Sequence, residues 1–195
     1  GLIGAAIPSR RFEAGVSELP HQILDRTILQ HHSAFFQNNL HLTPRLAAAV
    51  RKQLGEDPIE SLVDLYCGVG LHSMFASDKA SRVIGADNHP LAIASAKDNA
   101  VRAGLQDATF LCRSADDFAA DRQGLDSPVV VINPPRSGCG EEVIKGVCAW
   151  RPKRIVIVSC CLETQLNDLR AWLAREYVAH SISAFDMFPF TRFVE

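Results

Sequence analysis

Two adjacent thiols follow a run of β-branched residues, and a cysteine thiolate is a strong nucleophile. The stretch "IVIVSCCLET", residues 155 to 164, ends its apolar part at Cys160 and Cys161. Packing is the competing explanation, because free cysteine is among the most buried residue types. The choice between a nucleophile and a pair of core residues depends on the elements that carry these thiols.

Apolar runs alternate with helical patterns from residue 61 onward. Strands are expected over residues 61–66, 82–87, 109–112, 128–133, 154–159 and 178–185. Helices are expected over residues 71–80, 90–104, 115–120, 141–150 and 163–175. This alternation predicts an α/β fold with a doubly wound, mostly parallel, Rossmann-like sheet. Ligands of such sheets bind beyond the carboxyl ends of the strands, where the thiol pair falls.

A smaller β region precedes this alternation. Residues 22–36 mix short apolar pairs with polar residues and predict one or two antiparallel strands. Thr43 as N-cap and Gly55 as the stop then predict a helix. We divide the chain into an N-terminal β segment, residues 1–40, packed on or linked to a catalytic domain, residues 41–195. Because the sequence does not open on methionine, we expect a fragment of a longer protein.

Glycines at the end of the first strand of the alternating region indicate a nucleotide-like ligand. The stretch "DLYCGVG" places Gly68 and Gly70 at the strand end, where they let such a ligand approach the backbone. Asp87 ends the next strand about 20 residues later, where an acidic side chain commonly hydrogen-bonds ribose hydroxyls. NAD and S-adenosylmethionine both contain a ribose. The short glycine turn leaves little provision for a pyrophosphate and therefore favours S-adenosylmethionine.

The stretch "NPPR", residues 133–136, follows another predicted strand. Two successive prolines stiffen the backbone and remove N–H donors, which leaves Asn133 directed into the cleft. A rigid turn without function is the alternative. In methyltransferases that act on exocyclic amines, an aromatic residue usually follows the prolines. Here Arg136 follows them, which argues against that class.

Five motifs occur together in one order: "FFQNN", "DLYCGVG", "INPPRSG", "VSCCLET" and "DMFPFTRFVE". In order and spacing the sequence resembles the RNA 5-methyluridine methyltransferases over most of residues 33–195. These S-adenosylmethionine-dependent enzymes methylate carbon 5 of uridine in 23S ribosomal RNA and in transfer RNA. "NPPR" and "DMFPFT" are most similar to the ribosomal-RNA branch. The resemblance implies a class I methyltransferase fold and an RNA partner.

The resemblance also assigns roles to individual residues. Cys160 would be the nucleophile, and Glu195 would be the base that removes a proton. Together with the two glycines of the strand-end turn, the residues expected to bind the cofactor are Gln37, Tyr66, Gly68, Gly70, Asp87 and Asn133.

The chemistry of uracil independently requires a nucleophile and a base. Carbon 5 of uracil is too poor a nucleophile to attack a methylsulfonium directly. A thiolate that adds to C6 creates an enolate whose C5 can accept the methyl group. A base must then remove the C5 proton so that the cysteine can leave. Cys160 lies between a strand and a helix N-terminus, where the helix dipole favours a thiolate.

The sequence departs from the family pattern at several positions. Cys161 takes the place of the usual Asn, and we expect it to pack. Ser114 stands where many members carry an Asp near the adenine, and Asn133 replaces the commoner Asp. Relatives continue beyond the position of Glu195. Many members also carry an OB-like RNA-binding domain or a four-cysteine iron–sulfur site, and we predict no cluster here.

Charge and composition limit the partners and the location. The chain has 195 residues and a net charge of −2, without the basic footprint of a protein that binds nucleic acid alone. Small clusters at residues 10–11 and 151–154 are expected to be solvated faces. Apolar runs stay shorter than the ~18–20 residues of a membrane span. A cytoplasmic location with reduced thiols is therefore expected.

Metal binding is not predicted. The six cysteines include no CxxC pair, and no His pair at ligand spacing accompanies them, so a structural zinc site is not expected. His31 and His32 are adjacent in a predicted strand. Such neighbours face opposite sides, and we expect them to be ordinary strand residues that do not act jointly.

Two other functions stay open. An amino-group methyltransferase that uses "NPP" needs no nucleophilic cysteine, so its activity would survive Cys160→Ala. A catalytically silent RNA-binding module would fail to bind S-adenosylmethionine. Transfer RNA is an alternative substrate to 23S ribosomal RNA. The sequence gives neither the target nucleotide nor the oligomeric state.

Overall fold

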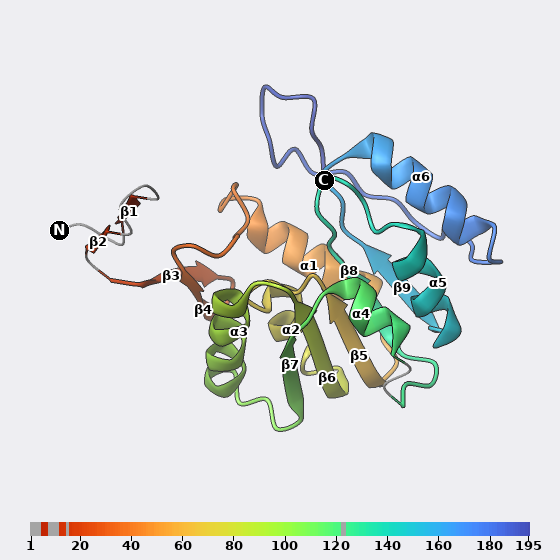
Figure 1. Cartoon of the computed structure of the whole chain (residues 1–195), viewed down its shortest axis with the longest axis horizontal. Coiled ribbons are helices and arrows are strands. Elements are labelled where there is room, and N and C mark those ends of the chain that lie inside the picture. The colour runs from red at the N-terminus through yellow and green to blue at the C-terminus, as the bar shows by residue number, and fades with distance from the viewer. Residues whose placement is uncertain (1–4, 8–11, 15, 122–123) are drawn as a thin grey trace.

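A parallel five-stranded sheet forms the centre of the computed structural model, which describes residues 5–7, 12–14, 16–121 and 124–195 (Figure 1). The sheet order is β7-β6-β5-β8-β9. The strands are β5 Ile59–Leu65, β6 Ala80–Asp87, β7 Ala108–Cys112, β8 Val129–Ile132 and β9 Arg154–Ile157. The order reverses between β5 and β8, so their carboxyl ends flank the point where doubly wound sheets bind ligands.

Helices cover both faces of this sheet. They are α1 Thr43–Gln53, α2 Leu71–Ala76, α3 Pro90–Arg102, α4 Ala115–Ala120, α5 Glu141–Ala149 and α6 Leu162–Leu173. Successive residues of β5 enter opposite cores: Leu62 packs with α1, α2 and α3, whereas Val63 packs with α4, α5 and α6. Burial on both faces explains why the strands are apolar without alternation.

An antiparallel hairpin, β3 Glu18–Ile23 and β4 Arg26–His31, lies against α3 (Figure 1). The Asn99 side chain of α3 accepts a hydrogen bond from Leu29 N at 2.8 Å and donates to Leu29 O at 2.9 Å. Ile23 and Ile28 join the core of the first three helices. A separate pair, β1 Ala5–Ile7 with β2 Phe12–Ala14, precedes the hairpin. The proposed boundary after residue 40 stays a prediction, and part of that segment lies outside the described residues.

Two predicted details are wrong. Helix α1 begins at Thr43 itself, because Leu42 occupies the N-cap and the Thr43 hydroxyl donates to Asn39 O at 2.8 Å. The strand predicted over residues 178–185 does not form. Its apolar residues have no neighbouring strand to pair with among the described residues, and Val178 and Ile182 are 86% and 80% exposed.

The two adjacent histidines also differ from expectation. Strand β4 ends at His31, and His32 belongs to the following turn, so the alternation of a strand does not apply. Their rings lie 4.4 Å apart between centroids instead of facing opposite sides. The His31 ring also hydrogen-bonds the Ser33 hydroxyl at 2.8 Å.

Among the residues that the structure describes, no helix is long and apolar enough to cross a membrane. Of the basic clusters noted in the sequence, residues 10–11 lie outside the described part. In the other cluster Arg151, Lys153 and Arg154 are exposed, as expected for a solvated face.

Candidate active site at the carboxyl ends of the strands

The turn after β5 has an unusual backbone. Tyr66, Gly68 and Gly70 have φ values of 57°, 53° and 82°, in the left-handed region. Glycine adopts this region freely, but tyrosine does so at a cost that is typical of functional sites. A Cβ added at Gly68 would meet nothing within 4 Å, so the backbone there is open to a ligand. Asn99 steadies the turn by donating to Val69 O at 2.9 Å.

Asp87, at the end of β6, lies next to this turn. Its Oδ2 accepts a hydrogen bond from Gly68 N at 2.9 Å, and its Oδ1 accepts one from His89 N at 2.9 Å. The carboxylate thus joins the ends of two neighbouring strands. Each oxygen retains a lone pair that can accept a further donor, and the side chain is half-buried. The structure therefore brings the predicted residues Gly68 and Asp87 together.

Asp64 was missed by sequence reasoning. It is fully buried in β5, and its Oδ2 accepts hydrogen bonds from Ser73 N at 3.1 Å and Ser73 Oγ at 2.6 Å. Desolvation raises the pKa of Asp64 to about 7, although both Ser73 hydrogen bonds oppose the rise. A carboxylate within the apolar run of residues 62–65 is the signal that could have found it. Through Ser73 it fixes the start of α2 against the glycine turn.

The loop between β8 and α5 carries Asn133, which is half-buried beside the end of β5. Its backbone N–H donates to Leu65 O at 3.2 Å. From the end of β5, the Tyr66 hydroxyl donates a hydrogen bond at 3.5 Å to Cys139 O in the same β8–α5 loop. The structure thus places Tyr66 and the Asn133 loop on the two sides of the point where the strand order reverses.

Helix α6 holds the same loop from its other side. The Thr164 hydroxyl donates to Arg136 O at 3.0 Å. The buried Asp168 accepts a hydrogen bond from Cys139 N at 2.7 Å. The loop that follows "NPP" is therefore fixed to the helix that begins just after the two thiols.

The two thiols have different environments. Cys160 is half-buried, whereas Cys161 is 8% exposed and occupies the N-cap of α6. Hydrogen bonds from the backbone and the hydroxyl of Thr164 lower the pKa of Cys161, and burial opposes them. This lowered pKa therefore belongs to the thiol at the N-cap of α6. Access to a substrate favours Cys160, as the sequence predicts.

Glu195 meets Gln37 across the length of the chain. Gln37 Nε2 lies 3.3 Å from Glu195 Oε1, and backbone hydrogen bonds in both directions join Glu195 to Phe185. Burial raises the pKa of Glu195, and the hydrogen bond from Gln37 opposes the rise. Within the described residues, Gln37 Oε1 and Glu195 Oε2 are buried without a hydrogen-bond partner. These two oxygens therefore keep an acceptor capacity that no described residue uses.

Further contacts join the C-terminal segment to the β8–α5 loop and to the residues just before α1. The Arg136 guanidinium lies 4.2 Å from the centroid of the Phe193 ring, and Asn39 Nδ2 lies 3.5 Å from Asp186 O. Figure 1 shows the C-terminus at the end of the sheet from which α6 starts. The described residues show no direct contact between Cys160 and Glu195. Ser114, near the position of the family's adenine contact, caps α4 by accepting from Asp117 N at 3.1 Å.

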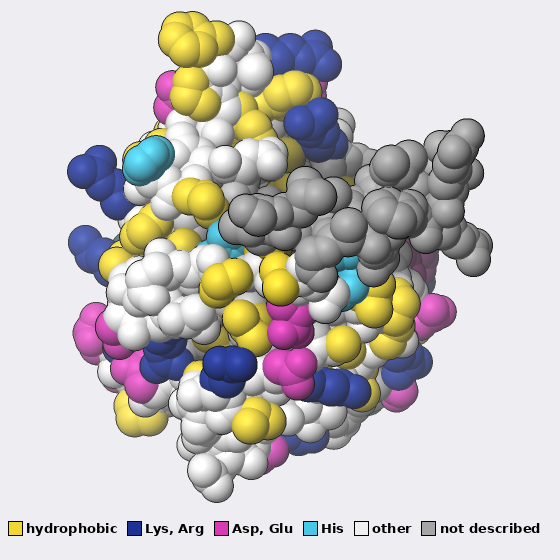
Figure 2. Space-filling view, turned by 90° about the vertical axis from the view of Figure 1, so that its left-hand side faces the viewer, with side chains coloured by type: hydrophobic (Ala, Val, Ile, Leu, Met, Phe, Trp, Pro, Cys, Tyr) yellow, Lys and Arg dark blue, Asp and Glu magenta, His cyan; other side chains and the backbone are white. Residues whose placement is uncertain are grey.

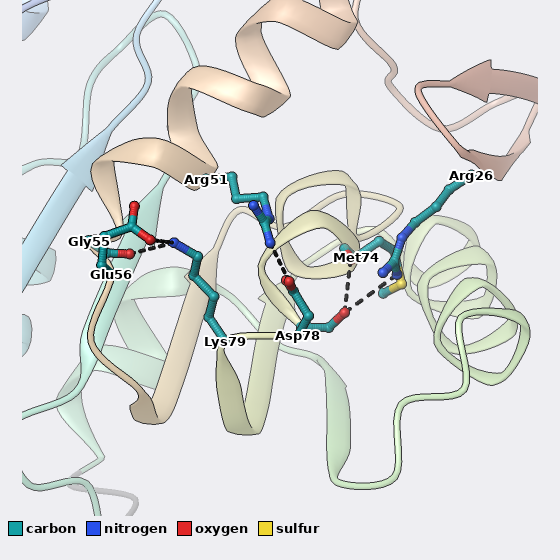
Figure 3. A network of polar contacts seen from close by, with 8 residues as sticks. Arg26, Arg51, Gly55, Glu56, Met74, Asp78 and Lys79 are labelled. Atoms are coloured by element: carbon teal, nitrogen blue, oxygen red, sulfur yellow. Dashed lines mark hydrogen bonds and ion pairs between the residues drawn. The ribbon is translucent and has the colours of Figure 1, made fainter.

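Two hollows lie away from these residues. One, of about 310 Å³, lies next to Trp150 and Arg151, at the opposite end of the sheet. The other, of about 470 Å³, lies between the β3–β4 hairpin and α2 and α3. Beside it Arg26 reaches from the hairpin toward the end of α2 (Figure 3), where its Nη1 lies 3.4 Å from Ser77 Oγ. Neither hollow is lined by a predicted site residue.

In the described part of the chain, no group of three or more His, Cys, Asp or Glu side chains could hold a metal ion.

The model of the tRNA (uracil-5-)-methyltransferase family matches residues 18–195. The chain belongs to this family. Family membership and the observed sheet confirm the predicted resemblance and the doubly wound α/β fold class.

Several relatives agree with this membership. An uncharacterized RNA methyltransferase from Caldanaerobacter subterraneus subsp. tengcongensis is 34% identical over 163 residues, covering 83% of this chain and 36% of the relative. The 23S rRNA (uracil(747)-C(5))-methyltransferase of Shewanella amazonensis is 36% identical over 157 residues. The match covers 80% of this chain and 40% of that relative. The chain thus spans less than half of the length of these curated relatives.

A solved structure resembles the whole described fold. It is the Pyrococcus abyssi tRNA (uracil-54, C5)-methyltransferase in complex with S-adenosyl-L-homocysteine. The similarity has a TM-score of 0.78 at 28% identity and covers 94% of this chain and 44% of that one.

Proposed function

We propose that this chain, chiefly its residues 41–195, is the catalytic part of an S-adenosylmethionine-dependent RNA methyltransferase that methylates carbon 5 of a uridine. The observation that carries the proposal is the presence of a thiol and a carboxyl in segments at one edge of the sheet, without a direct contact between them in the described part of the chain. A half-buried thiol, Cys160, follows β9, and a carboxyl with a raised pKa, Glu195, closes the neighbouring segment. Thiol addition followed by proton removal needs these two groups.

The residues at the strand ends suit S-adenosylmethionine. Gly68 leaves the turn open, Gly70 supplies its left-handed backbone, and Asp87 keeps lone pairs for ribose hydroxyls. The unpartnered Gln37 Oε1 offers a buried acceptor to a cationic or N–H-bearing ligand. Tyr66 and Asn133 flank the point where the strand order reverses. When bound, the cofactor supplies an electrophilic methyl group on a sulfonium.

In the proposed reaction, the Cys160 thiolate forms a bond to uracil C6, and the electron pair moves to C5 as an enolate. C5 would then form a bond to the methyl group, while the bond from the methyl carbon to the sulfonium sulfur breaks and leaves a neutral thioether. Glu195 next removes the C5 proton, the C5–C6 double bond forms again, and the bond from C6 to the Cys160 sulfur breaks. Burial makes Glu195 a stronger base, because the raised pKa increases its affinity for that proton.

The proposed substrate is 23S ribosomal RNA in the cytoplasm, with transfer RNA as the alternative. The motifs "NPPR" and "DMFPFT" support the first choice, and so does the rRNA enzyme among the relatives. The Pyrococcus abyssi enzyme supports the second.

Release of tritium tests the reaction. RNA transcribed with [5-³H]uridine is incubated with S-adenosylmethionine and the protein as it occurs in the cell. Methylation at C5 must displace the tritium into water, in equal amount to the 5-methyluridine measured by nucleoside mass spectrometry. Methyl transfer without tritium release would support an amino-group methyltransferase instead. Absence of both, on ribosomal and transfer RNA alike, would contradict the proposal.

A further inference from the structure

Phe190 is an aromatic side chain that folding does not explain. Its relative exposure is 108%, so it buries nothing against the described residues. Its φ of 64° lies in the left-handed region, which is costly for a bulky residue. Exposure and strain together indicate that the ring is presented for a ligand.

The turn that presents this ring is fixed. Thr191 N donates to Phe188 O at 3.1 Å, and the Thr191 hydroxyl donates to the same oxygen at 2.7 Å. The Phe193 backbone N–H in turn donates to Thr191 Oγ1 at 3.2 Å. Phe190 thus stands at the tip of a turn whose two ends are held by Thr191, close in sequence to Glu195.

Two guanidiniums lie beside this turn. Arg136 is 4.2 Å and Arg192 is 5.4 Å from the centroid of the Phe193 ring, in cation–π contact. Both arginines are exposed, and among the described residues neither forms a salt bridge. Figure 2 shows hydrophobic and Lys/Arg side chains next to each other at the top of the molecule, where Figure 1 places the C-terminal segment.

We infer that Phe190, Arg136 and Arg192, here called the Phe190 patch, bind single-stranded RNA next to the target uridine. A base stacks on Phe190, and the two guanidiniums contact phosphates. Aromatic platforms beside positive charge are the usual means of binding single strands. Because the chain as a whole carries a net charge of −2, a polyanion needs such a local pair of cations. The inference rests on the proposed function, because it assumes an RNA substrate.

Binding of a fluorescein-labelled ten-nucleotide oligouridylate, followed by anisotropy at several KCl concentrations, tests the patch. Phe190→Leu, which keeps an apolar side chain but loses the ring, should weaken binding about tenfold. Phe190→Tyr should keep the affinity within about twofold, because the ring remains. Arg192→Gln should lower the slope of log K against log salt concentration by about 0.7.

Arg82→Gln is the matched control, since Arg82 is exposed at the amino end of β6, at the other end of the sheet. It should leave the slope of log K against log salt concentration unchanged.

Three results would overturn the inference: wild type fails to bind the oligouridylate, Phe190→Leu binds it as wild type does, or Arg82→Gln lowers the salt slope as much as Arg192→Gln does. Tritium release from labelled RNA is measured separately. Release without any effect of the Phe190 variants overturns the patch alone, whereas patch-dependent binding without release contradicts the proposed function alone.

Discussion

On the side of β5 and β6 the candidate site is built by neighbouring strand ends, whereas on the side of β9 it is assembled from segments far apart in the chain. Asp87 and Asp64 bond backbone and side-chain groups of the adjoining glycine turn and α2 at 2.6–3.1 Å. Glu195 meets Gln37 across a separation of 158 residues at 3.3 Å. In the proposed function the first side would bind the cofactor, and the second side would bind the RNA.

The largest effect is expected on the β9 side. Cys160→Ala removes the only protein atom that the proposed mechanism joins to uracil, so methyl transfer should fall by about a thousandfold or more. Cofactor affinity, measured by calorimetry, should stay unchanged because the variant leaves the β5–β6 side intact. If the variant transfers methyl groups within tenfold of the wild-type rate, Cys160 on the β9 side is not the nucleophile.

On the cofactor side the expected effect is on stability. The pKa of Asp64 is raised from 3.8 to about 7, so the folded state binds this proton more tightly than the unfolded state. Protonated Asp64 contributes fully to the free energy of unfolding below pH 4. This contribution is lost as pH rises through 7, and the loss is at most about 4 kcal/mol. Asp64→Asn cannot ionise. The free energy of unfolding, measured with urea, should therefore rise for Asp64→Asn relative to wild type between pH 4 and pH 8.

A flat difference across that range would show that Asp64 is ionised in the folded protein at all these pH values. Asp78→Asn offers a contrast. Desolvation raises the pKa of Asp78, but the hydrogen bond and charge of Arg51, a backbone hydrogen bond and the charge of Arg26 together lower it. Asp78 is exposed, so its variant should change stability little at any pH.

A smaller effect is expected at Asp87. Asp87→Ala removes the proposed ribose acceptor and the bond to Gly68 N, which should weaken S-adenosylmethionine binding by about 1–3 kcal/mol. RNA affinity should not change, since the Phe190 patch lies on the other side of the site. Calorimetry that shows unchanged cofactor affinity would exclude Asp87 from the site.

The smallest effect concerns the second thiol. Cys161 is buried at the N-cap of α6, and the proposed mechanism does not use its sulfur. Cys161→Ala should therefore keep methyl transfer within about threefold of wild type. A loss as large as that of Cys160→Ala would show that the lowered pKa of Cys161 matters to the reaction.

The same contrast explains what the sequence could predict. The elements of the sheet and the glycine turn depend on local periodicity and residue type, and their prediction is largely correct. The Gln37–Glu195 contact depends on how distant segments fold back, so the motifs indicated both residues but not their hydrogen bond. The strand expected over residues 178–185 failed for a related reason. Alternating apolar residues do not supply the partner strand that a ladder requires.

The histidine pair and Asp64 illustrate two further limits. The His31–His32 contact arises because β4 ends at His31, whereas strand structure was predicted over residues 22–36, and element boundaries are the weakest part of such predictions. Asp64 was visible within "DLYCGVG", yet its burial and its bonds to Ser73 depend on the packing of α2.

Trapping the covalent intermediate tests the central claim most directly. Glu195→Gln keeps the shape of the side chain but cannot accept the C5 proton, so methylated RNA should remain attached to the protein. The protein as it occurs in the cell is incubated with S-adenosylmethionine and its RNA, separated on a denaturing gel and digested for peptide mass spectrometry. We predict a methylated uridine joined to Cys160. A nucleotide joined to Cys161, or no adduct with RNA that the wild type methylates, would contradict it.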